Sequence, residues 1–285
     1  MARVVALFIA ALFAAGAVHA QALEGRLKKI AETKAIAIGY RTDAVPFSFT
    51  GDKNQPDGFS VELCKRVVSS IERQLNLQGL KVNWVPVTVQ SRFDAVAKGD
   101  VDMECGSSTV TLARLKQVDF SSVIFAESTG LLVKTDSGVR SLSGLSGMKI
   151  AVIKGTTNER VIEAQLKRRQ LNATVLAFAS REEALAALEE GKADAFASDR
   201  LLLLGASLKA KNPRALVLLP DQLSYEPYGI VLPRGDAALR LAVNTGLAQV
   251  FRGAEIGELF RFWFGDLGAP SAVLEAVYVL GAIPE

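Results

Sequence analysis

The chain has 285 residues, with 33 basic and 30 acidic side chains and a formal charge of +3 at neutral pH. This balance lacks the strong excess of Lys and Arg that is typical of nucleic-acid-binding proteins, so the composition argues against that class. A chain of this length is too long for one typical core and is sufficient for two domains of ordinary size.

The first twenty residues predict an export signal. Arg3 is followed by an apolar stretch from Val4 to Val18 and by the small-residue ending Val18-His19-Ala20. This pattern is typical of a secretory signal peptide (residues 1–20) that is cleaved after Ala20, and it predicts a periplasmic location. No later apolar run reaches the roughly 20 residues that a membrane span needs, so we expect the mature protein to be soluble.

Strand and helix patterns alternate along the rest of the chain. The first series predicts a strand at 36–40, a helix at 60–76, a strand at 80–85, a helix at 91–98 and a strand at 101–105. The second series predicts a strand at 149–153, a helix at about 158–169, a strand at 174–178, a helix at 181–190 and a strand at 193–197. Such alternation is typical of an α/β sheet with parallel strands, and the two series predict two similar lobes.

Two further extended segments, 130–134 and 228–232, are expected to cross between the lobes as a hinge. Residues 237–264 form a helical pattern that ends in aromatic residues and returns the chain to the first lobe. We therefore predict an α/β fold of two Rossmann-like lobes, in which lobe 1 comprises residues 21–131 and 230–285 and lobe 2 comprises residues 132–229. The cleft between the lobes is the expected ligand site, since ligands of open α/β sheets bind at the carboxyl ends of the strands.

The segment from Asp102 to Lys134 carries the clearest chemical pattern. Ser107, Ser108 and Thr109 follow an apolar run and lead into a short helical pattern just before Arg114. N–H groups at a helix start favour an anion, and a guanidinium can bind both oxygens of a carboxylate. The segment therefore predicts half of a site for a free amino acid, although such Ser/Thr clusters also occur as plain helix N-caps.

Eight motifs carry a family resemblance that spans nearly the whole mature chain. They are YRTDAVPFSF (40–49), GFSVELC (58–64), PVTVQSRF (86–93), DMECGSSTVTLAR (102–114), VDFSSVIF (118–125), GTTNE (155–159), ASDRLLL (197–203) and FRFWF (260–264). In this order they resemble the type II periplasmic solute-binding proteins of amino-acid ABC transporters, solute-binding protein family 3. The most similar branch is the one that binds glutamate and aspartate.

The resemblance implies a role for individual residues at the two ends of the ligand backbone. Arg114, with Thr109 and Thr156, is expected to bind the α-carboxylate, and Asp199, with Ser107, is expected to bind the α-ammonium. A zwitterion that leaves water needs a fixed partner of opposite charge at each end. For Asp199 the alternative is an N-cap on a helix at 200–208.

The resemblance also indicates the side-chain pocket. Arg41 and Arg92 match arginines near the distal carboxylate of glutamate or aspartate. Val89 stands where this branch has a serine that faces the ligand. Arg181 stands where it has a histidine, and it either adds a cation or caps a surface helix. Glutamine or a broader set of amino acids therefore stays open as the ligand.

We expect a non-catalytic, monomeric binding protein, without cofactor or metal, that closes on L-glutamate or L-aspartate. Its partners would be the ABC permease and ATPase subunits of the inner membrane. An alternative is an exported enzyme similar to cyclohexadienyl dehydratase, for which Glu104 and Lys154 lie close to the expected site. A third possibility is the ligand-sensing component of a signalling system, since fold alone does not define function.

Two cysteines, Cys64 and Cys105, would meet an oxidising environment after export. A disulfide between them and two separate buried thiols are both compatible with the sequence.

Overall fold

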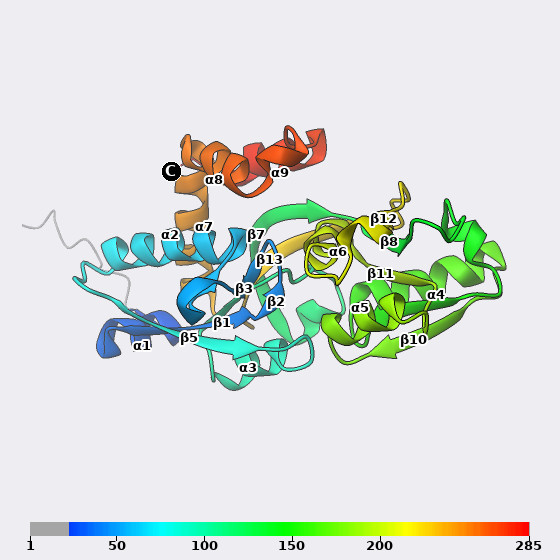
Figure 1. Ribbon diagram of the computed structural model, residues 1–285. Coiled ribbons are helices and arrows are strands. Elements are labelled where there is room, and N and C mark those ends of the chain that lie inside the picture. The colour runs from blue at the N-terminus through cyan, green and yellow to red at the C-terminus, as the bar shows by residue number, and fades with distance from the viewer. Residues whose placement is uncertain (1–22, 285) are drawn as a thin grey trace, which may run out of the picture.

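The computed structural model describes residues 23–284, and the predicted signal peptide of residues 1–20 lies outside them. Two α/β lobes, each built around its own five-stranded sheet, lie side by side (Figure 1). Within the described residues, no helix combines the length and the apolar character that a bilayer span requires. The predicted two-lobe fold is confirmed.

The sheet of lobe 1 has the strand order β5-β1-β6-β13-β7. Its strands are β1 (Ala35–Arg41), β5 (Lys81–Val87), β6 (Met103–Cys105), β7 (Val118–Glu127) and β13 (Glu226–Pro233). The strand β1 is parallel to β5 and β6, as predicted. The strand β13, for whose direction the sequence makes no prediction, is antiparallel to both β6 and β7, because it enters the sheet from the opposite end after the second lobe.

Helices cover both faces of this sheet, and a small three-stranded sheet lies beside it. The helices are α1 (Gly25–Thr33), α2 (Phe59–Gln74), α3 (Arg92–Lys98), α7 (Ala237–Arg252), α8 (Glu255–Phe264) and α9 (Ala272–Gly281), and the short strands are β2 (Asp43–Ala44), β3 (Ser48–Thr50) and β4 (Pro56–Asp57). The predicted single helix at 237–264 is wrong, since the extended backbone of Gly253 separates α7 from α8. Phe260 and Phe264 of α8 do return to the lobe 1 core, where Phe264 packs on Phe47 and Phe59.

Lobe 2 repeats the same arrangement with the strand order β10-β9-β11-β8-β12. Its elements are β8 (Thr129–Lys134), β9 (Lys149–Ile153), α4 (Thr157–Arg169), β10 (Thr174–Phe178), α5 (Arg181–Glu189), β11 (Ala195–Asp199), α6 (Arg200–Ser207) and β12 (Leu216–Leu218). The first three strands of this order are parallel, and β8 is antiparallel to β11 and β12. Short 3-10 helices lie in the connections of both lobes: η1 (Asp52–Asn54), η2 (Arg114–Lys116), η3 (Leu142–Leu145), η4 (Pro213–Ala215) and η5 (Gly265–Leu267).

The chain passes between the two sheets twice, as predicted, but the segments 130–134 and 228–232 are not themselves the crossings, because they lie within β8 of lobe 2 and β13 of lobe 1. The first crossing is at Ser128, where β7 of one sheet ends and β8 of the other begins. The second lies between Leu218 at the end of β12 and Glu226 at the start of β13. These crossings lie a few residues from the expected lobe boundaries at 131 and 230, and the exact division of the chain into lobes stays a prediction.

The two lobes contact each other across the cleft. Leu202 of α6 belongs to the apolar core of lobe 1, and Val89, which follows β5, belongs to a core of lobe 2. The Gln90 side chain donates a hydrogen bond to the Ala179 carbonyl oxygen at 3.2 Å. A Cβ atom built on Gly205 of α6 would overlap the Val45 carbonyl oxygen of lobe 1. The structure is therefore a closed arrangement of the lobes.

Cys64 and Cys105 form a disulfide, with their Cα atoms 6.4 Å apart. It ties α2 to the last residue of β6, and the next residues of the chain enter the cleft. Of the two readings that the sequence left open, the disulfide is therefore the one that the structure adopts.

Candidate functional site

A cavity lies between the lobes, where the carboxyl ends of several strands and the first turns of the following helices meet. Its lining residues are Arg41, Val89, Arg92, Ser107, Thr109, Thr156, Thr157, Asn158, Arg181, Ser198, Asp199 and Leu202. Every predicted site residue except Arg114 is in this set. This is the position where the fold brings ligand-binding side chains together in open α/β sheets.

Lobe 1 contributes two buried arginines to the cavity wall. Arg41, the last residue of β1, donates from Nη2 to the Asp43 carboxylate at 2.5 Å, which holds the pKa of Asp43 below its usual value despite its burial. Arg92, the first residue of α3, is only 3% exposed, and its guanidinium lies over the Phe93 ring at 4.8 Å. Burial and then the neighbouring Arg114 and Arg41 lower the pKa of Arg92 to about 9.

Arg114 lies behind the wall and does not line the cavity itself. Its Nη1 donates to the Thr109 carbonyl oxygen at 2.7 Å, and its guanidinium lies over Phe93, the ring that Arg92 also covers. The short helical pattern predicted after Thr109 is the 3-10 helix η2, which begins at Arg114, while Thr109 itself is extended and forms an isolated bridge with Tyr228 of β13. Arg114 therefore reaches the cavity through the Thr109 backbone and through its charge.

Arg181 enters the cavity from lobe 2. It is the first residue of α5, is 6% exposed, and donates from Nη1 to the Ser198 hydroxyl at 3.0 Å. This burial rules out the alternative of a surface helix cap. Within residues 23–284 no carboxylate oxygen lies within 4.0 Å of the Arg92, Arg114 or Arg181 guanidinium, and the Nε atoms of Arg92 and Arg181 are buried without a hydrogen-bond partner.

Asp199 contributes an acidic side chain to the cavity wall. It ends β11 and holds the N-cap position of α6, but its side chain makes no capping hydrogen bond, so the N-cap alternative is not realised. Its Oδ1 accepts from the Asn158 amide at 3.2 Å instead. Burial, and then the nearby Glu226 carboxylate, raise the pKa of Asp199 to about 6.

Hydroxyl groups from both lobes also line the cavity. Thr156 caps α4, since its hydroxyl accepts from the Glu159 amide at 3.2 Å and donates to the Ile153 carbonyl oxygen at 2.7 Å. The hydroxyls of Thr109 and Thr157 meet across the cleft at 3.3 Å. This bond ties lobe 1 to lobe 2 in the closed arrangement.

Glu104 lies beneath the wall rather than in it. The side chain is fully buried, and its Oε2 accepts from the Ser108 hydroxyl at 2.8 Å. Burial raises the pKa of Glu104, while the charge of Arg92 opposes that rise. Lys154, the other residue considered for catalysis, is exposed and does not line the cavity.

Sequence reasoning missed four residues of the wall: Thr157, Asn158, Ser198 and Leu202. Thr157 and Asn158 belong to the GTTNE motif that opens α4, where polar side chains at a helix start after a strand are a usable signal. Ser198 directly precedes Asp199 and was equally accessible to such reasoning. Leu202 gives no local signal, because it reaches the cavity only through the packing of α6 on the other lobe.

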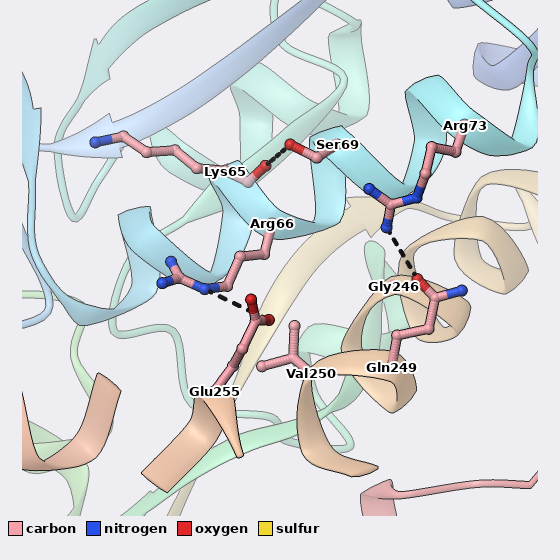
Figure 2. A pocket seen from close by; sticks show the side chains of 8 residues that line it. All are labelled: Lys65, Arg66, Ser69, Arg73, Gly246, Gln249, Val250 and Glu255. Atoms are coloured by element: carbon pink, nitrogen blue, oxygen red, sulfur yellow. Dashed lines mark hydrogen bonds and ion pairs between the residues drawn. The ribbon is translucent and has the colours of Figure 1, made fainter. Parts of the chain in front are cut away.

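A second hollow lies on the outer face of lobe 1 between α2 and α7 (Figure 2). Its basic side chains have protein partners: Arg66 pairs with Glu255 at 3.8 Å, and Arg73 donates to Gln249 at 3.3 Å. Arg66 has carboxylate partners in Glu62 and Glu255, whereas Arg92 and Arg181 of the cleft have none among residues 23–284. The hollow is therefore a surface feature and not a competing site.

Comparison with known proteins adds three findings. Residues 36–266 match the family described as bacterial extracellular solute-binding proteins, family 3. An L-glutamate/L-aspartate-binding protein of Pseudomonas aeruginosa is 37% identical over 257 residues, which cover 90% of this chain and 85% of the relative. A glutamate/aspartate import solute-binding protein of Escherichia coli is 31% identical, with coverage of 86% and 81%.

Among solved structures, an ancestral amino acid-binding protein described as a precursor of cyclohexadienyl dehydratase is similar at a TM-score of 0.72. It is 29% identical, and the match covers 84% of this chain and all of that one. The similarity thus extends over both lobes and the cleft between them.

Proposed function

Because the chain belongs to family 3 of the bacterial extracellular solute-binding proteins, we propose that it is the substrate-binding component of an amino-acid ABC uptake system. It binds L-glutamate or L-aspartate in the cleft and closes its two lobes around the ligand. The ligand then passes to the ABC permease and ATPase of the inner membrane. In this role the closed state is favoured by contacts that the ligand makes with both lobes.

The observation that carries the acidic specificity is the set of guanidinium groups without a carboxylate partner. Arg92 and Arg181 line the cavity and Arg114 lies directly behind it, whereas Arg41 is paired with Asp43. A buried charge is costly until a group of opposite sign reaches it. A ligand with two carboxylates supplies two such groups, while an amide such as glutamine supplies one.

The same geometry supports an orientation of the ligand. The α-ammonium would bind Asp199 and Ser107, and the α-carboxylate would bind beside Thr109 and Thr156 in the field of Arg114. The distal carboxylate would reach Arg92, Arg41 and Arg181. Val89 removes a hydroxyl from this pocket, and Arg181 supplies an additional cation in its place.

Calorimetric titration of ligand-stripped protein with glutamate, aspartate, glutamine and asparagine tests this proposal. We expect tight binding of the two acids and binding of the amides that is weaker by about tenfold or more, since a lost charge-assisted hydrogen bond costs about 1.5 to 3 kcal/mol. A preference for an amide would refute the distal assignment. No binding of any of the four would refute the amino-acid site.

The alternative to a binding protein is an enzyme similar to cyclohexadienyl dehydratase, since one similar solved structure is described as a precursor of that enzyme. A dehydratase needs a general acid that reaches the substrate. Glu104 and Lys154, the two residues considered for that role, do not line the cavity. We therefore propose a non-enzymatic role, and turnover of prephenate or arogenate by the purified protein would overturn it.

The cellular setting is part of the proposal. Cleavage after Ala20 would release a monomeric protein into the periplasm, where mass spectrometry of the mature N-terminus and light scattering check both points. A chain that delivers ligand to a permease must also be required for uptake of labelled glutamate by the host. Normal uptake in its absence would favour a sensing role.

A further inference from the structure

The hinge holds a continuous hydrogen-bond chain that ends at the ammonium site. The Asn158 amide nitrogen donates to Asp199 at 3.2 Å and to the Thr129 hydroxyl at 2.8 Å. The Thr129 hydroxyl lies 2.8 Å from the Ser224 hydroxyl, which donates to Glu226 Oε1 at 2.7 Å. The hydrogen-bond chain includes residues from both crossings of the polypeptide between the lobes. Thr129 follows the first crossing, and Ser224 and Glu226 belong to the second.

The direction of the protons along this chain follows from donor counting. The Ser224 hydroxyl is oriented to donate either to Thr129 or to Glu226, and it has one proton for the two acceptors. When Glu226 accepts that proton, Ser224 accepts from Thr129. Thr129 then accepts from Asn158, which has one amide hydrogen left for Asp199. The charge on Glu226 thus orients Asn158 so that it donates to Asp199 and keeps Asp199 an acceptor.

Glu226 is placed for an electrostatic role as well. Its side chain is 2% exposed, and its Oε2 is buried without a hydrogen-bond partner. Glu226 lies opposite Glu127 in the register of β13 and β7, so two carboxylates meet at the hinge. The second oxygen of Glu226 accepts no hydrogen bond within residues 23–284, and the carboxylate lies close enough to Asp199 for its charge to raise the pKa of Asp199.

We infer that Glu226 is a positioning residue for the ligand ammonium, acting on Asp199 through the hinge hydrogen-bond chain and through its charge. This inference rests on the proposed amino-acid function and extends it to a residue that does not line the cavity. It also gives the hinge a part in recognition, since Thr129, Ser224 and Glu226 belong to the two segments where the chain crosses between the lobes.

The charge effect has a calculable consequence. A proton and an ammonium group are both single positive charges at Asp199, so a neighbour that favours one favours the other. Glu226 is, after burial, the largest cause of the raised pKa of Asp199. Removing its charge should therefore weaken ammonium binding by about tenfold per pKa unit that it contributes.

Other ionisable groups face Asp199 and stay in place in this comparison. They are Arg181 of α5, Arg92 of α3, Arg114 of η2, Glu127 of β7 and Tyr228 of β13. Because these groups are the same in wild type and variant, a change in the pH profile reports on Glu226.

The test measures glutamate affinity by calorimetry from pH 5 to pH 8 for wild type, Glu226→Gln, Ser224→Ala and Asp199→Asn. Wild-type affinity should fall below about pH 6, where Asp199 takes up a proton. In Glu226→Gln the affinity at pH 8 should be about tenfold weaker, and the fall should begin at lower pH. Ser224→Ala should weaken binding but leave the onset of the fall at the wild-type pH, because the charge of Glu226 remains.

Two results would overturn the inference. One is a Glu226→Gln variant with wild-type affinity and pH profile, and the other is uniform weakening with an unchanged onset and a lower melting temperature, which is the mark of a structural role. Glu226→Asp, which keeps the charge, should restore the wild-type onset. Wild-type affinity in Asp199→Asn would refute the proposed site itself, so the two failures are distinguishable.

Discussion

Replacing Arg92 with Met should stabilise the ligand-free protein and weaken glutamate binding. The pKa of Arg92 is lowered to about 9 by its burial and its neighbouring arginines. At neutral pH the gap from the ordinary guanidinium pKa corresponds to about 5 kcal/mol of destabilisation, since one pKa unit equals about 1.4 kcal/mol. Met removes this charge while it retains an apolar side chain of similar length.

Part of this gain in stability is lost again, because Met does not keep the contact that the guanidinium makes with the neighbouring aromatic ring. The Arg92 guanidinium lies over the Phe93 ring at 4.8 Å, a contact worth about 1 to 2 kcal/mol when buried. A net gain of about 3 kcal/mol remains, which raises the melting temperature of a chain of this size by about 6 to 12 °C. Loss of a charge-assisted hydrogen bond to the ligand should weaken glutamate binding by about tenfold to a hundredfold.

Urea unfolding of ligand-free protein and calorimetric titration measure the two effects separately. Arg41→Met is the matched control, because Arg41 is paired with Asp43 at 2.5 Å and its removal leaves that carboxylate without its cation. We expect Arg41→Met to lower stability, in contrast to Arg92→Met. A less stable Arg92→Met variant, or one with unchanged glutamate affinity, would show that the charge of Arg92 is balanced within the protein.

Three further predictions concern the frame of the site. Replacing Cys64 and Cys105 together by Ala should lower the free energy of unfolding by about 4 kcal/mol, the chain-entropy value for their sequence separation of 41, and urea unfolding checks this. Gly205→Ala should weaken glutamate binding by about tenfold or more, because the added Cβ would overlap the Val45 carbonyl on closure and overpacking costs about 1 to 3 kcal/mol. Titration of Gly257→Ala is the control, since its Cβ meets no backbone atom within 4 Å. Burial raises the pKa of Glu127 from 4.5 to about 7, so the folded state holds the proton more tightly and stability falls as pH rises between these values. Glu127→Gln should therefore be about 3 kcal/mol more stable than wild type at pH 8 and no more stable at pH 4, and equal gains at both pH values in urea unfolding would contradict this reasoning.

Local periodicity was sufficient for most of the elements. The strands β9 and β10 have the predicted bounds, and α3, α4 and α5 begin or end within a residue of the prediction. These segments form because the hydrophobic pattern and their own caps agree, as with Ser180, whose hydroxyl accepts from the Glu183 amide at the start of α5. Local signals of this kind are available in the sequence.

The elements that differ depend on distant parts of the chain. The reversed direction of β13 follows from its entry from lobe 2, and the loop through Thr109 is extended because it pairs with Tyr228, more than a hundred residues away. Helices α1 and α9 and the small sheet β2-β3-β4 were not predicted. They lie in short or terminal segments whose structure is determined by packing on lobe 1.

In the candidate site, too, the sequence identified individual residues but not the contacts between distant parts of the chain. The family resemblance named the arginines and Asp199, and the structure brings them to one cavity. It did not reveal that Arg92 and Arg114 share the Phe93 ring, or that Glu226 connects to Asp199 through Ser224 and Thr129. These relations join residues from both lobes and the hinge, so no pattern within one segment of sequence encodes them.

The cleft brings together charged side chains of both signs, which fits a zwitterion with a second carboxylate. Arg92 and Arg181 line it without a carboxylate partner among residues 23–284, while Asp199 lies near Glu226 and Glu127 of the strands at the hinge. Each group of like charges is unfavourable by itself, and closure brings the groups out of water. A ligand whose carboxylates reach the arginines and whose ammonium reaches the acids relieves both, so its binding energy is greatest in the closed state. Closure would then depend on ligand charge as much as on ligand shape, which is the property that a selective uptake receptor requires.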